Sequence, residues 1–407
     1  MPRPATSGPD PDRADVRNAA PPRRSSKRRQ ERRRLRDRRG MRIVLGVAVV
    51  FFCWFAWSMG HALTAASGGT VANRLAEWAR DHYLGPLVTL GEWITYEPPK
   101  VGGKPSFKLT APDSSQVPAA AKGLSQGRLV TPIFPARLGS PAGKPLPGEG
   151  VWRVLGSVNG KAAVLGTYLR PDRVHTSYAE GIVSMDQRLV RFQLHPGAED
   201  PGPGNWKAPA WIPPGSRTGL LATFNGGFKI ASARGGFYLN GVTKGTLHRG
   251  AASLVYYRDG RVNIGTWGTD AHMAPQVAGV RQNLRLIVDH GKVPASVNVN
   301  VLSNWGATLG AGEYVWRSGV GITADGRIVY VYGPALNVRE LAGLLQRAGA
   351  VRAMQLDINT DSMSFMYYRS GRHPADPTPI NLLPDQRQPP QRFYSISSRD
   401  FTAVVAR

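Results

Sequence analysis

The sequence contains a single cysteine, Cys53, among its 407 residues. One thiol cannot form an internal disulfide, and it excludes a Cys-rich zinc site. The 8 histidines are scattered singly, without the paired spacing that is typical of zinc ligands. The sequence also lacks a P-loop of the form G-x-x-x-x-G-K-[ST], which excludes the common phosphate-binding loop of nucleotide hydrolases.

Acidic residues are scarce, with 27 Asp and Glu against 52 Lys and Arg, which gives a formal net charge of +25. Residues 1–42 carry 15 of the basic and 5 of the acidic side chains, a net charge of +10, and the remaining residues carry +15. The densest basic run, over residues 23–42, has no apolar periodicity. Such a segment cannot bury a core. We therefore expect residues 1–42 to form a basic arm that is disordered or weakly helical.

Charged residues are absent from Ile43 to Gly60, and the apolar run continues to Leu63. Its length reaches the roughly 20 residues that a helix needs to cross a bilayer. Trp54 and Trp57 suit the outer interface, and a basic flank before the span indicates an N-terminus inside. We expect a transmembrane helix over residues 43–63, so that the protein contacts the lipid bilayer as a single-pass protein of the plasma membrane. The C-terminal part would lie outside.

A cleaved signal peptide is the alternative to an anchor. Small residues near 62–66 could form the cleavage site, and the protein would then be secreted. The leader of 42 residues and the length of the apolar run favour the anchor.

Nucleic acid is the partner that so basic a chain first suggests. No groove-reading or base-stacking motif accompanies the basic arm, and attraction to anionic lipid explains its charge. We expect no nucleic-acid partner.

Composition divides the remainder of the chain. Residues 64–97 show apolar residues at helical spacing, which indicates an amphipathic juxtamembrane segment; a helix packed on the following domain is the alternative. Residues 98–150 contain 10 Pro and 8 Gly and are expected to form an extended linker. Residues 151–407 show no break and are expected to fold as one domain.

Strands dominate this domain. Asn159-Gly160, Asp259-Gly260 and Asp325-Gly326 each separate two β-rich runs, and these dipeptides are strong hairpin signals. We therefore assign Asp259 and Asp325 to turns rather than to catalysis. One helix is well marked, with a capping box from Asn337 to Glu340. The pattern predicts an α+β fold with large mixed or antiparallel sheets and a few flanking helices.

Two clusters bring polar groups beside glycine. Asn225 precedes Gly226 and Gly227 between aromatic residues, where the backbone can approach another group closely. A hairpin turn is the alternative interpretation. Arg317 is followed by small residues that lead into a strand, and its guanidinium fork fits phosphate or carboxylate. A surface arginine is the alternative there.

The third cluster follows a predicted buried strand and contains Asp357, Asn359 and Asp361. Two carboxylates and an amide could serve acid–base chemistry or bind a divalent cation such as Ca²⁺. A polar strand end is the alternative interpretation.

In their order along the chain, these clusters resemble the phosphodiester glycosidase family. That family has an Asn-Gly-Gly-Phe motif, an Arg motif that opens a strand with an Asp-Gly turn, a capped helix and a strand that ends in Asp. The matching positions are Asn225-Gly226-Gly227-Phe228, Arg317-Ser318-Gly319-Val320-Gly321 with Asp325-Gly326, Glu340-Leu341-Ala342, and Leu356-Asp357. The segment from Leu286 to Gly291 is similar to the strand and turn before the Arg motif.

The resemblance implies hydrolysis of a sugar-1-phosphodiester through an oxocarbenium-like transition state. Asp357 would be the carboxylate at the sugar, Arg317 the phosphate clamp, and Asn225 a ligand of a sugar hydroxyl or phosphate oxygen. Asn359 and Asp361 would shape the pocket or hold the cation. The remaining candidate substrate contacts are Gly226, Gly227, Phe228, Ser318 and, as a second carboxylate, Asp289.

One departure from the family pattern follows Asp357, where Ile358-Asn359-Thr360-Asp361 replace the expected glycines. Side chains at these positions narrow or change the pocket. The sequence therefore supports two functions. The first is a membrane-anchored, extracytoplasmic hydrolase of phosphodiester-linked envelope glycans. The second is a non-catalytic protein that binds a glycan or an anionic wall polymer.

Overall fold

A computed structural model describes residues 24–64, 71, 74–75, 78–79, 82, 84, 96–110, 134–298, 305–306, 312–371 and 373–407, with the backbone alone over 24–39. The chain separates into two compact units, Met1–Ala62 and Leu63–Arg407. The amphipathic segment expected over residues 64–97 lies mostly outside the described residues. The same holds for residues 1–23 of the basic arm.

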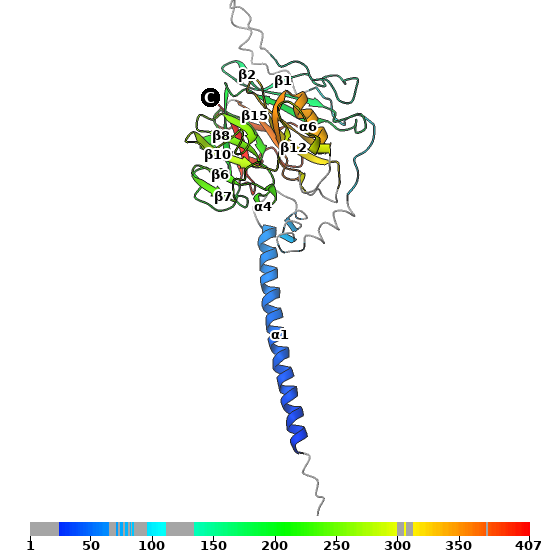
Figure 1. Cartoon of the computed structure of the whole chain (residues 1–407), viewed down its shortest axis with the longest axis vertical. Coiled ribbons are helices and arrows are strands. Elements are labelled where there is room, and N and C mark those ends of the chain that lie inside the picture. The colour runs from blue at the N-terminus through cyan, green and yellow to red at the C-terminus, as the bar shows by residue number, and fades with distance from the viewer. Residues whose placement is uncertain are drawn as a thin grey trace, which may run out of the picture. The chain divides into compact units, whose positions relative to one another are not determined.

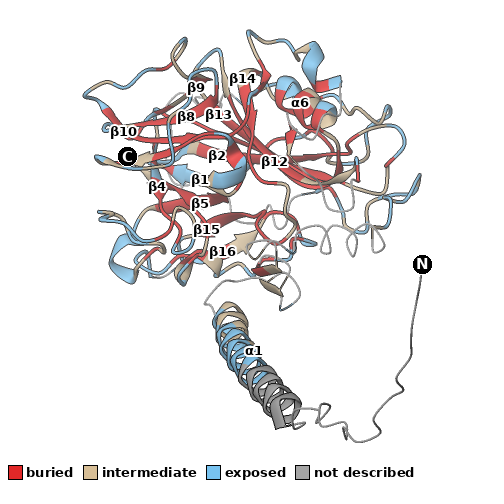
Figure 2. Ribbon diagram, turned by 60° about the horizontal axis from the view of Figure 1, so that its bottom comes forward, coloured by how far each residue is buried: buried red, intermediate tan, exposed pale blue. Residues whose placement is uncertain are grey.

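The first unit is dominated by one helix, α1 (Arg24–Thr64). Its stretch Gly40–Thr64 is long and apolar enough to cross a membrane, and it includes the predicted span 43–63. A signal sequence has the same properties. Most residues of this stretch are exposed (Figure 2).

The start of α1 covers residues 24–42 of the basic arm, which are helical. Arg, Lys, Gln, Glu and Leu all have high helix propensity. Extending an existing helix is much easier than nucleating a new one. The apolar segment therefore continues as a helix into the basic run.

The second unit contains three sheets whose strands pair antiparallel (Figure 1). The largest has seven strands in the order β1–β2–β3–β13–β12–β14–β11. Their bounds are β1 Arg153–Val158, β2 Lys161–Leu169, β3 Glu180–Met185, β13 Ile328–Leu336, β12 Val315–Thr323, β14 Ala350–Gln355 and β11 Leu286–Val288.

Two further sheets have five strands each, in the orders β7–β6–β10–β8–β9 and β16–β15–β5–β17–β4. In the first, the bounds are β7 Val242–Lys244, β6 Phe237–Leu239, β10 Val277–Gln282, β8 Ala252–Tyr257 and β9 Val262–Thr266. In the second, they are β16 Thr378–Asn381, β15 Phe365–Arg369, β5 Leu220–Asn225, β17 Phe401–Ala406 and β4 Val190–His195.

Helices are few and short in this unit, which confirms the predicted α+β class. Among the described residues of this unit, the complete α-helices are α4 (Ile230–Ala233) and α6 (Val338–Arg347), and the complete 3₁₀-helices are η3 (Pro214–Ser216), η4 (Ala295–Asn298) and η6 (Arg392–Tyr394). Both halves of the capping box are present, since Asn337 accepts from the Glu340 N–H and Glu340 accepts from the Asn337 N–H.

The three predicted hairpins are also present. Asn159-Gly160 joins β1 to β2, Asp259-Gly260 lies between β8 and β9, and Asp325-Gly326 lies between β12 and β13. Asn159 and Gly160 both have positive φ values, of 50° and 74°. Two such residues in succession give the turn whose twist matches that of the flanking strands.

The seven-stranded sheet is buried on both faces. On one face lies α6, beside β12 (Figure 1), and its Leu341, Leu344 and Leu345 pack into an apolar cluster. On the other, the main cluster joins the seven-stranded sheet to both five-stranded sheets and includes Tyr330 and Phe224. Side chains alternate along a strand, so neighbouring residues of β12 point to opposite faces of the sheet.

Part of the expected linker over residues 98–150 is folded onto this unit. Leu109 and Leu138 belong to the two main apolar clusters. Glu149 is fully buried, pairs with Arg170 at 3.1 Å and accepts from the Ser140 hydroxyl at 2.6 Å. The linker was predicted from the many Pro and Gly residues of the segment. The few side chains that anchor it form no pattern in the sequence. The folded domain therefore includes residues before Val151.

The Glu149–Arg170 pair gives a test of this extension. Glu149→Ala leaves the buried Arg170 without its partner, a change that costs about 3–5 kcal/mol of stability. Urea unfolding of the detergent-solubilised full chain, followed by tryptophan fluorescence, measures it. Arg261→Ala breaks an exposed pair with Asp259 and should cost at most about 1 kcal/mol. Equal losses in the two variants would show that residues 134–150 are a loose linker.

Candidate functional site

Asp357, two residues past the end of β14, is fixed by Ser318 of β12. The backbone N–H of Ser318 donates to the Asp357 carbonyl at 3.0 Å, and the Leu356 N–H donates back to the Ser318 carbonyl at 2.8 Å. The Asp357 N–H also donates to the Ser318 hydroxyl at 3.1 Å. The strand pairing of β12 and β14 thus continues past the sheet and holds the predicted carboxylate in one place.

Asn225 ties this arrangement to a second sheet. It is the last residue of β5, and its amide donates to the Ser318 hydroxyl at 3.0 Å and to the Gly226 carbonyl at 2.8 Å. Its amide oxygen accepts from the Tyr330 hydroxyl at 2.6 Å and from the Ser364 N–H at 3.2 Å. Both donors and both acceptor positions are used. Asn225 therefore positions its neighbours here and has no hydrogen-bonding capacity left for a ligand.

The Asp357 carboxylate has two unlike oxygens. Oδ1 accepts from the backbone N–H groups of Ile358 at 2.7 Å and Asn359 at 3.1 Å. Oδ2 lies 3.7 Å from Nη2 of Arg399. One oxygen is thus held by the turn, and the other faces a guanidinium.

Two arginines from the C-terminal segment act electrostatically on this carboxylate. Arg399 donates through Nη2 to the Gly227 carbonyl at 3.0 Å, while its buried Nε has no hydrogen-bond partner among the described residues. Arg392 of η6 donates through Nη1 to the Ser362 carbonyl at 2.6 Å and to the Ser364 hydroxyl at 3.1 Å. Burial lowers the pKa of Arg392 to about 10 while Asp357 raises it, so the guanidinium stays charged at neutral pH.

A buried ion pair lies behind the Asn-Gly-Gly-Phe motif. Nε of Arg281 donates to Asp400 at 2.9 Å, and Arg281 also donates to the Phe228 carbonyl. Burial alone would lower the pKa of Arg281, but Asp400, with Asp200 and Asp357, raises it above its usual value. The arginine is therefore a fixed positive charge beneath the motif.

The two glycines of the motif make room for this pair. A Cβ on Gly226 would lie 2.1 Å from Oδ2 of Asp400, and one on Gly227 would lie 3.1 Å from the Asn283 side chain. The backbone at these glycines therefore does approach other groups closely, as predicted, and those groups are the side chains of Asp400 and Asn283. Phe228 is buried beside Leu284 and Ile358.

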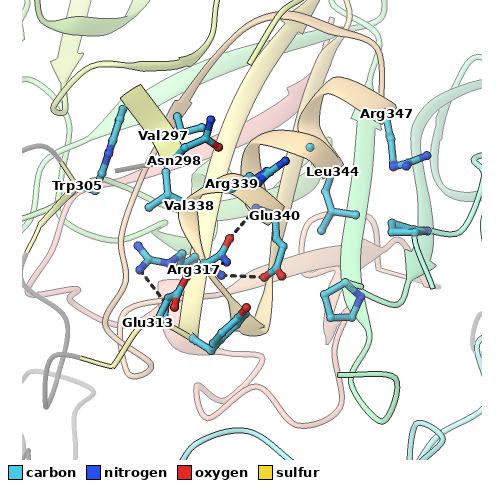
Figure 3. A pocket seen from close by; sticks show the side chains of 15 residues that line it. Val297, Asn298, Trp305, Glu313, Arg317, Val338, Arg339, Glu340, Leu344 and Arg347 are labelled. Carbon is cyan, nitrogen blue, oxygen red and sulfur yellow. Dashed lines mark hydrogen bonds between the residues drawn. The ribbon is translucent and has the colours of Figure 1, made fainter. Parts of the chain in front are cut away.

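Arg317 is not brought together with Asn225 and Asp357. It precedes Ser318 in β12 and therefore faces the α6 side of the sheet, as Gly319 does, whose Cβ would touch Leu345. Its guanidinium is buried and donates to the Leu336 carbonyl at 2.8 Å and to Gln355 Oε1 at 3.0 Å. It lines a cavity of about 520 Å³ with Glu313 and Glu340 (Figure 3).

Asp289 also lies away from Asp357. It follows β11, whose Val288 pairs with Ala353, and it approaches Arg352 at 3.9 Å. This is the far end of β14 from Asp357. Asp289 lines a different cavity.

Asn359 and Asp361 follow Asp357 in the same turn. Asn359 Oδ1 accepts from the Asp361 N–H at 3.0 Å, and Asp361 Oδ1 pairs with Arg387 at 3.2 Å. Asp361 Oδ2 is buried with no hydrogen-bond partner in the part of the chain that the structure describes. These carboxylates therefore have guanidinium neighbours, and a Ca²⁺ ion between Asp357 and Asp361 stays a prediction.

Arg392, Arg399, Tyr330 and Ser364 complete the cluster and were missed from the sequence. The arginines lie in the C-terminal segment, in no motif that spacing could reveal. Tyr330 did carry a signal, because a tyrosine in an apolar buried strand needs a partner for its hydroxyl.

A separate group, Asp172, His175 and Glu340, has ligand atoms within 4.8 Å of one another. Its residues also have local roles, since Asp172 accepts from the Val174 and His175 N–H groups and Glu340 caps α6. Burial, with the nearby Asp172 and Glu313 carboxylates, raises the pKa of Glu340 to about 8. Glutamate 340 is therefore largely neutral in the folded protein at pH 7.

The comparisons with known proteins agree with the motif order. Residues 218–376 match the phosphodiester glycosidase family, which confirms the resemblance over that segment. No curated protein matches the chain.

Three solved structures are similar to the chain at low identity. The catalytic domain of zebrafish N-acetylglucosamine-1-phosphodiester alpha-N-acetylglucosaminidase, auto-inhibited by its pro-peptide, is 12% identical with a TM-score of 0.39; the match covers 63% of this chain and 88% of that one. A hypothetical protein from Synechocystis is 12% identical with a TM-score of 0.33, over 61% and 63% of the two chains. A Burkholderia pseudomallei protein described as exported is 13% identical with a TM-score of 0.28, over 56% and 74%.

Gly226→Ala tests the packing of the motif on the ion pair. The added methyl would collide with Asp400, and overpacking of this kind costs about 1–3 kcal/mol. Gly343→Ala is the control, because its Cβ would meet nothing within 4 Å and alanine favours a helix by up to about 1 kcal/mol. Urea unfolding of the full chain should show opposite signs for the two variants. A neutral Gly226→Ala would contradict the packing.

The raised pKa of Glu340 predicts a pH-dependent stability. The carboxyl loses its proton near pH 4.3 when unfolded but near 8 when folded. The wild-type protein therefore loses stability as the pH rises through about 4 to 8. Glu340→Gln keeps an oxygen for the Asn337 N–H and removes this loss.

Thermal unfolding of both proteins is measured between pH 4.5 and 9. The unfolding temperature of the variant should rise relative to that of the wild type as the pH increases to about 8, and the difference should stay constant above that pH. Glu97→Gln, at an exposed acid, serves as the control. A difference between wild type and Glu340→Gln that does not change with pH would contradict the assignment.

Proposed function

We propose that the protein is a phosphodiester glycosidase that hydrolyses sugar-1-phosphodiester bonds in anionic glycans of the cell envelope. The observation that carries this proposal is the juxtaposition of Asp357 with Arg399 and Arg392. Asp357 and the network that holds it lie within the segment that matches the family. A carboxylate beside two cations suits a reaction in which positive charge develops on a sugar and negative charge on a phosphate.

The chemistry follows from these charges. The bond between the anomeric carbon and the phosphate oxygen breaks, water supplies the oxygen that replaces it, and the products are a free sugar and a phosphomonoester. Oδ2 of Asp357 would stabilise the oxocarbenium-like sugar. Arg399 and Arg392 would bind the leaving phosphate, and their charge lessens the need for a strong general acid.

This proposal moves the phosphate-binding role from Arg317 to Arg399 and Arg392. The Arg317 guanidinium donates hydrogen bonds to the Leu336 carbonyl, the Gln355 side chain and the Glu313 carbonyl. These groups lie on the face of the sheet opposite to Asp357. The role of Arg317 would be to support the structure. Asn225 and Ser318 would position Asp357 without touching the sugar.

The turnover of glucose and N-acetylglucosamine 1-(methyl phosphate) by the detergent-solubilised full chain tests the assignment. Asp357→Asn should lower kcat by about 10³-fold, because the carboxylate acts on charge that appears in the transition state. Arg399→Gln should mainly raise KM for the same substrates, through loss of a phosphate contact. Asp325→Asn, in an exposed hairpin turn, should leave both constants unchanged.

Full activity in Asp357→Asn would overturn the catalytic assignment. A second candidate function, binding without hydrolysis, is favoured by the side chains of Ile358 to Asp361 where the family has glycines. It would show as saturable binding of an anionic glycan by the wild-type protein with no sugar released.

We further infer that Gly40–Thr64 anchors the domain in the plasma membrane with the C-terminal unit outside. The apolar composition and the basic flank support this arrangement. Retention of the full-length protein in carbonate-washed membranes checks the anchor. Recovery of a shortened, soluble protein would instead indicate a cleaved signal sequence.

A further inference from the structure

A second cavity, of about 530 Å³, lies between the β8–β9 region and the turns that flank β11. Three arginines line it, Arg234 after α4, Arg249 before β8 and Arg285 before β11, together with His248. We call it the arginine cavity.

Within the part of the chain that the structure describes, the three arginines of the cavity have no carboxylate partner. Arg234, Arg249 and Arg285 are exposed, and none of them forms an ion pair with a carboxylate among the described residues. The acid in the lining, Asp289, lies 3.0 Å from Nδ1 of His290 and 3.9 Å from Nε of Arg352. The cavity therefore offers guanidinium forks to an outside anion.

A buried amide fixes the segments that carry these arginines. Gln282 has no exposed surface, and its Oε1 accepts from the N–H groups of Gly236 at 3.1 Å and His248 at 2.8 Å. Its Nε2 donates to the His248 carbonyl at 3.2 Å. Gln282 is three residues before Arg285 in the chain. One side chain thus holds the Arg234, Arg249 and Arg285 segments around a common space.

Residues in and beside the wall of the arginine cavity contact the neighbours of Asp357. Asn283, next to Gln282, donates to the Leu356 carbonyl at 2.9 Å and accepts from the Phe228 N–H at 3.1 Å. Leu284, which lines the cavity, packs with Phe228 against Ile358. The wall of the cavity is thus in contact with the residues on each side of Asp357.

Two residues that line the arginine cavity have an unusual backbone conformation. Arg234 and Leu284 have positive φ values of 51° and 54°, which non-glycine residues seldom adopt. The Leu284 N–H donates to the carbonyl of Ala233, the residue before Arg234, at 2.8 Å. The fold maintains this local strain where the arginines converge.

We propose that the arginine cavity binds a phosphodiester group of a polymeric substrate, at least one repeat away from the bond that is cleaved beside Asp357. This proposal rests on the proposed function and specifies its substrate as a chain with regularly spaced phosphates. Arginine binds phosphate through paired N–H groups, and the wall shared with the Asp357 site places the cavity along the path of such a chain.

The test compares a polymer with a single unit. The substrates are a chain of N-acetylglucosamine 1-phosphate repeats and N-acetylglucosamine 1-(methyl phosphate), each with the detergent-solubilised full chain. Arg249→Gln/Arg285→Gln should raise KM for the polymer by about tenfold, which corresponds to about 1.4 kcal/mol. The values of kcat/KM for the single unit should stay within about twofold of wild type.

The matched control is Arg339→Gln/Arg347→Gln, which removes the same charge from exposed arginines at the other cavity. It should leave both substrates unchanged. If both double variants raised KM for the polymer equally, the effect would come from the loss of net charge, and the proposal would be overturned. An unchanged KM for the polymer in the cavity variant would also overturn it.

A binding measurement separates this proposal from the proposed function. Affinity electrophoresis in gels that contain the polymer gives a dissociation constant whether or not sugar is released. Weaker binding, by about tenfold, in the cavity variant alone would support the arginine cavity even if no substrate is hydrolysed. Equal binding by wild type and both variants would overturn it while leaving hydrolysis of the single unit intact.

Discussion

The side-chain amide of Asn225 is the interaction on which the candidate site depends. It joins β5 in one sheet to Ser318 and Tyr330 in another, and Ser318 in turn holds the backbone of Asp357. A buried amide with every donor and acceptor used is stable only in one arrangement, because any shift of either sheet leaves a polar group unpaired. The same bonds that fix the position of Asp357 therefore also fix the packing of the two sheets.

Charge is distributed around this network in a consistent way. The Arg281–Asp400 pair lies beneath the Asn-Gly-Gly-Phe motif, and Arg399 and Arg392 approach Asp357 from the C-terminal segment. Farther along the same wall, the arginines of the second cavity face solvent. The excess positive charge of the chain outside the basic arm is thus partly organised in one region, where an anionic glycan would meet both a reactive carboxylate and additional cations.

Sequence patterns predicted the elements but only part of the site. The β-rich runs, the Asp-Gly and Asn-Gly turns between them and the Asn337–Glu340 capping box are local signals, and the structure contains each of them. Asn225 and Asp357 were found because they lie in motifs. Arg392 and Arg399 were missed because their approach to Asp357 depends on how β17 pairs with β5. Arg317 was placed in the site because residue order does not show which face of a buried strand carries the chemistry.

The alternation along β12 has a further consequence for how this protein can change. Arg317 and Ser318 are neighbours in sequence, but one supports the α6 side and the other the network around Asp357. Inserting or deleting one residue in this strand would exchange their faces, and would place a guanidinium among apolar sheets and a hydroxyl under the helix. The length of the strand is therefore constrained on both sides at once.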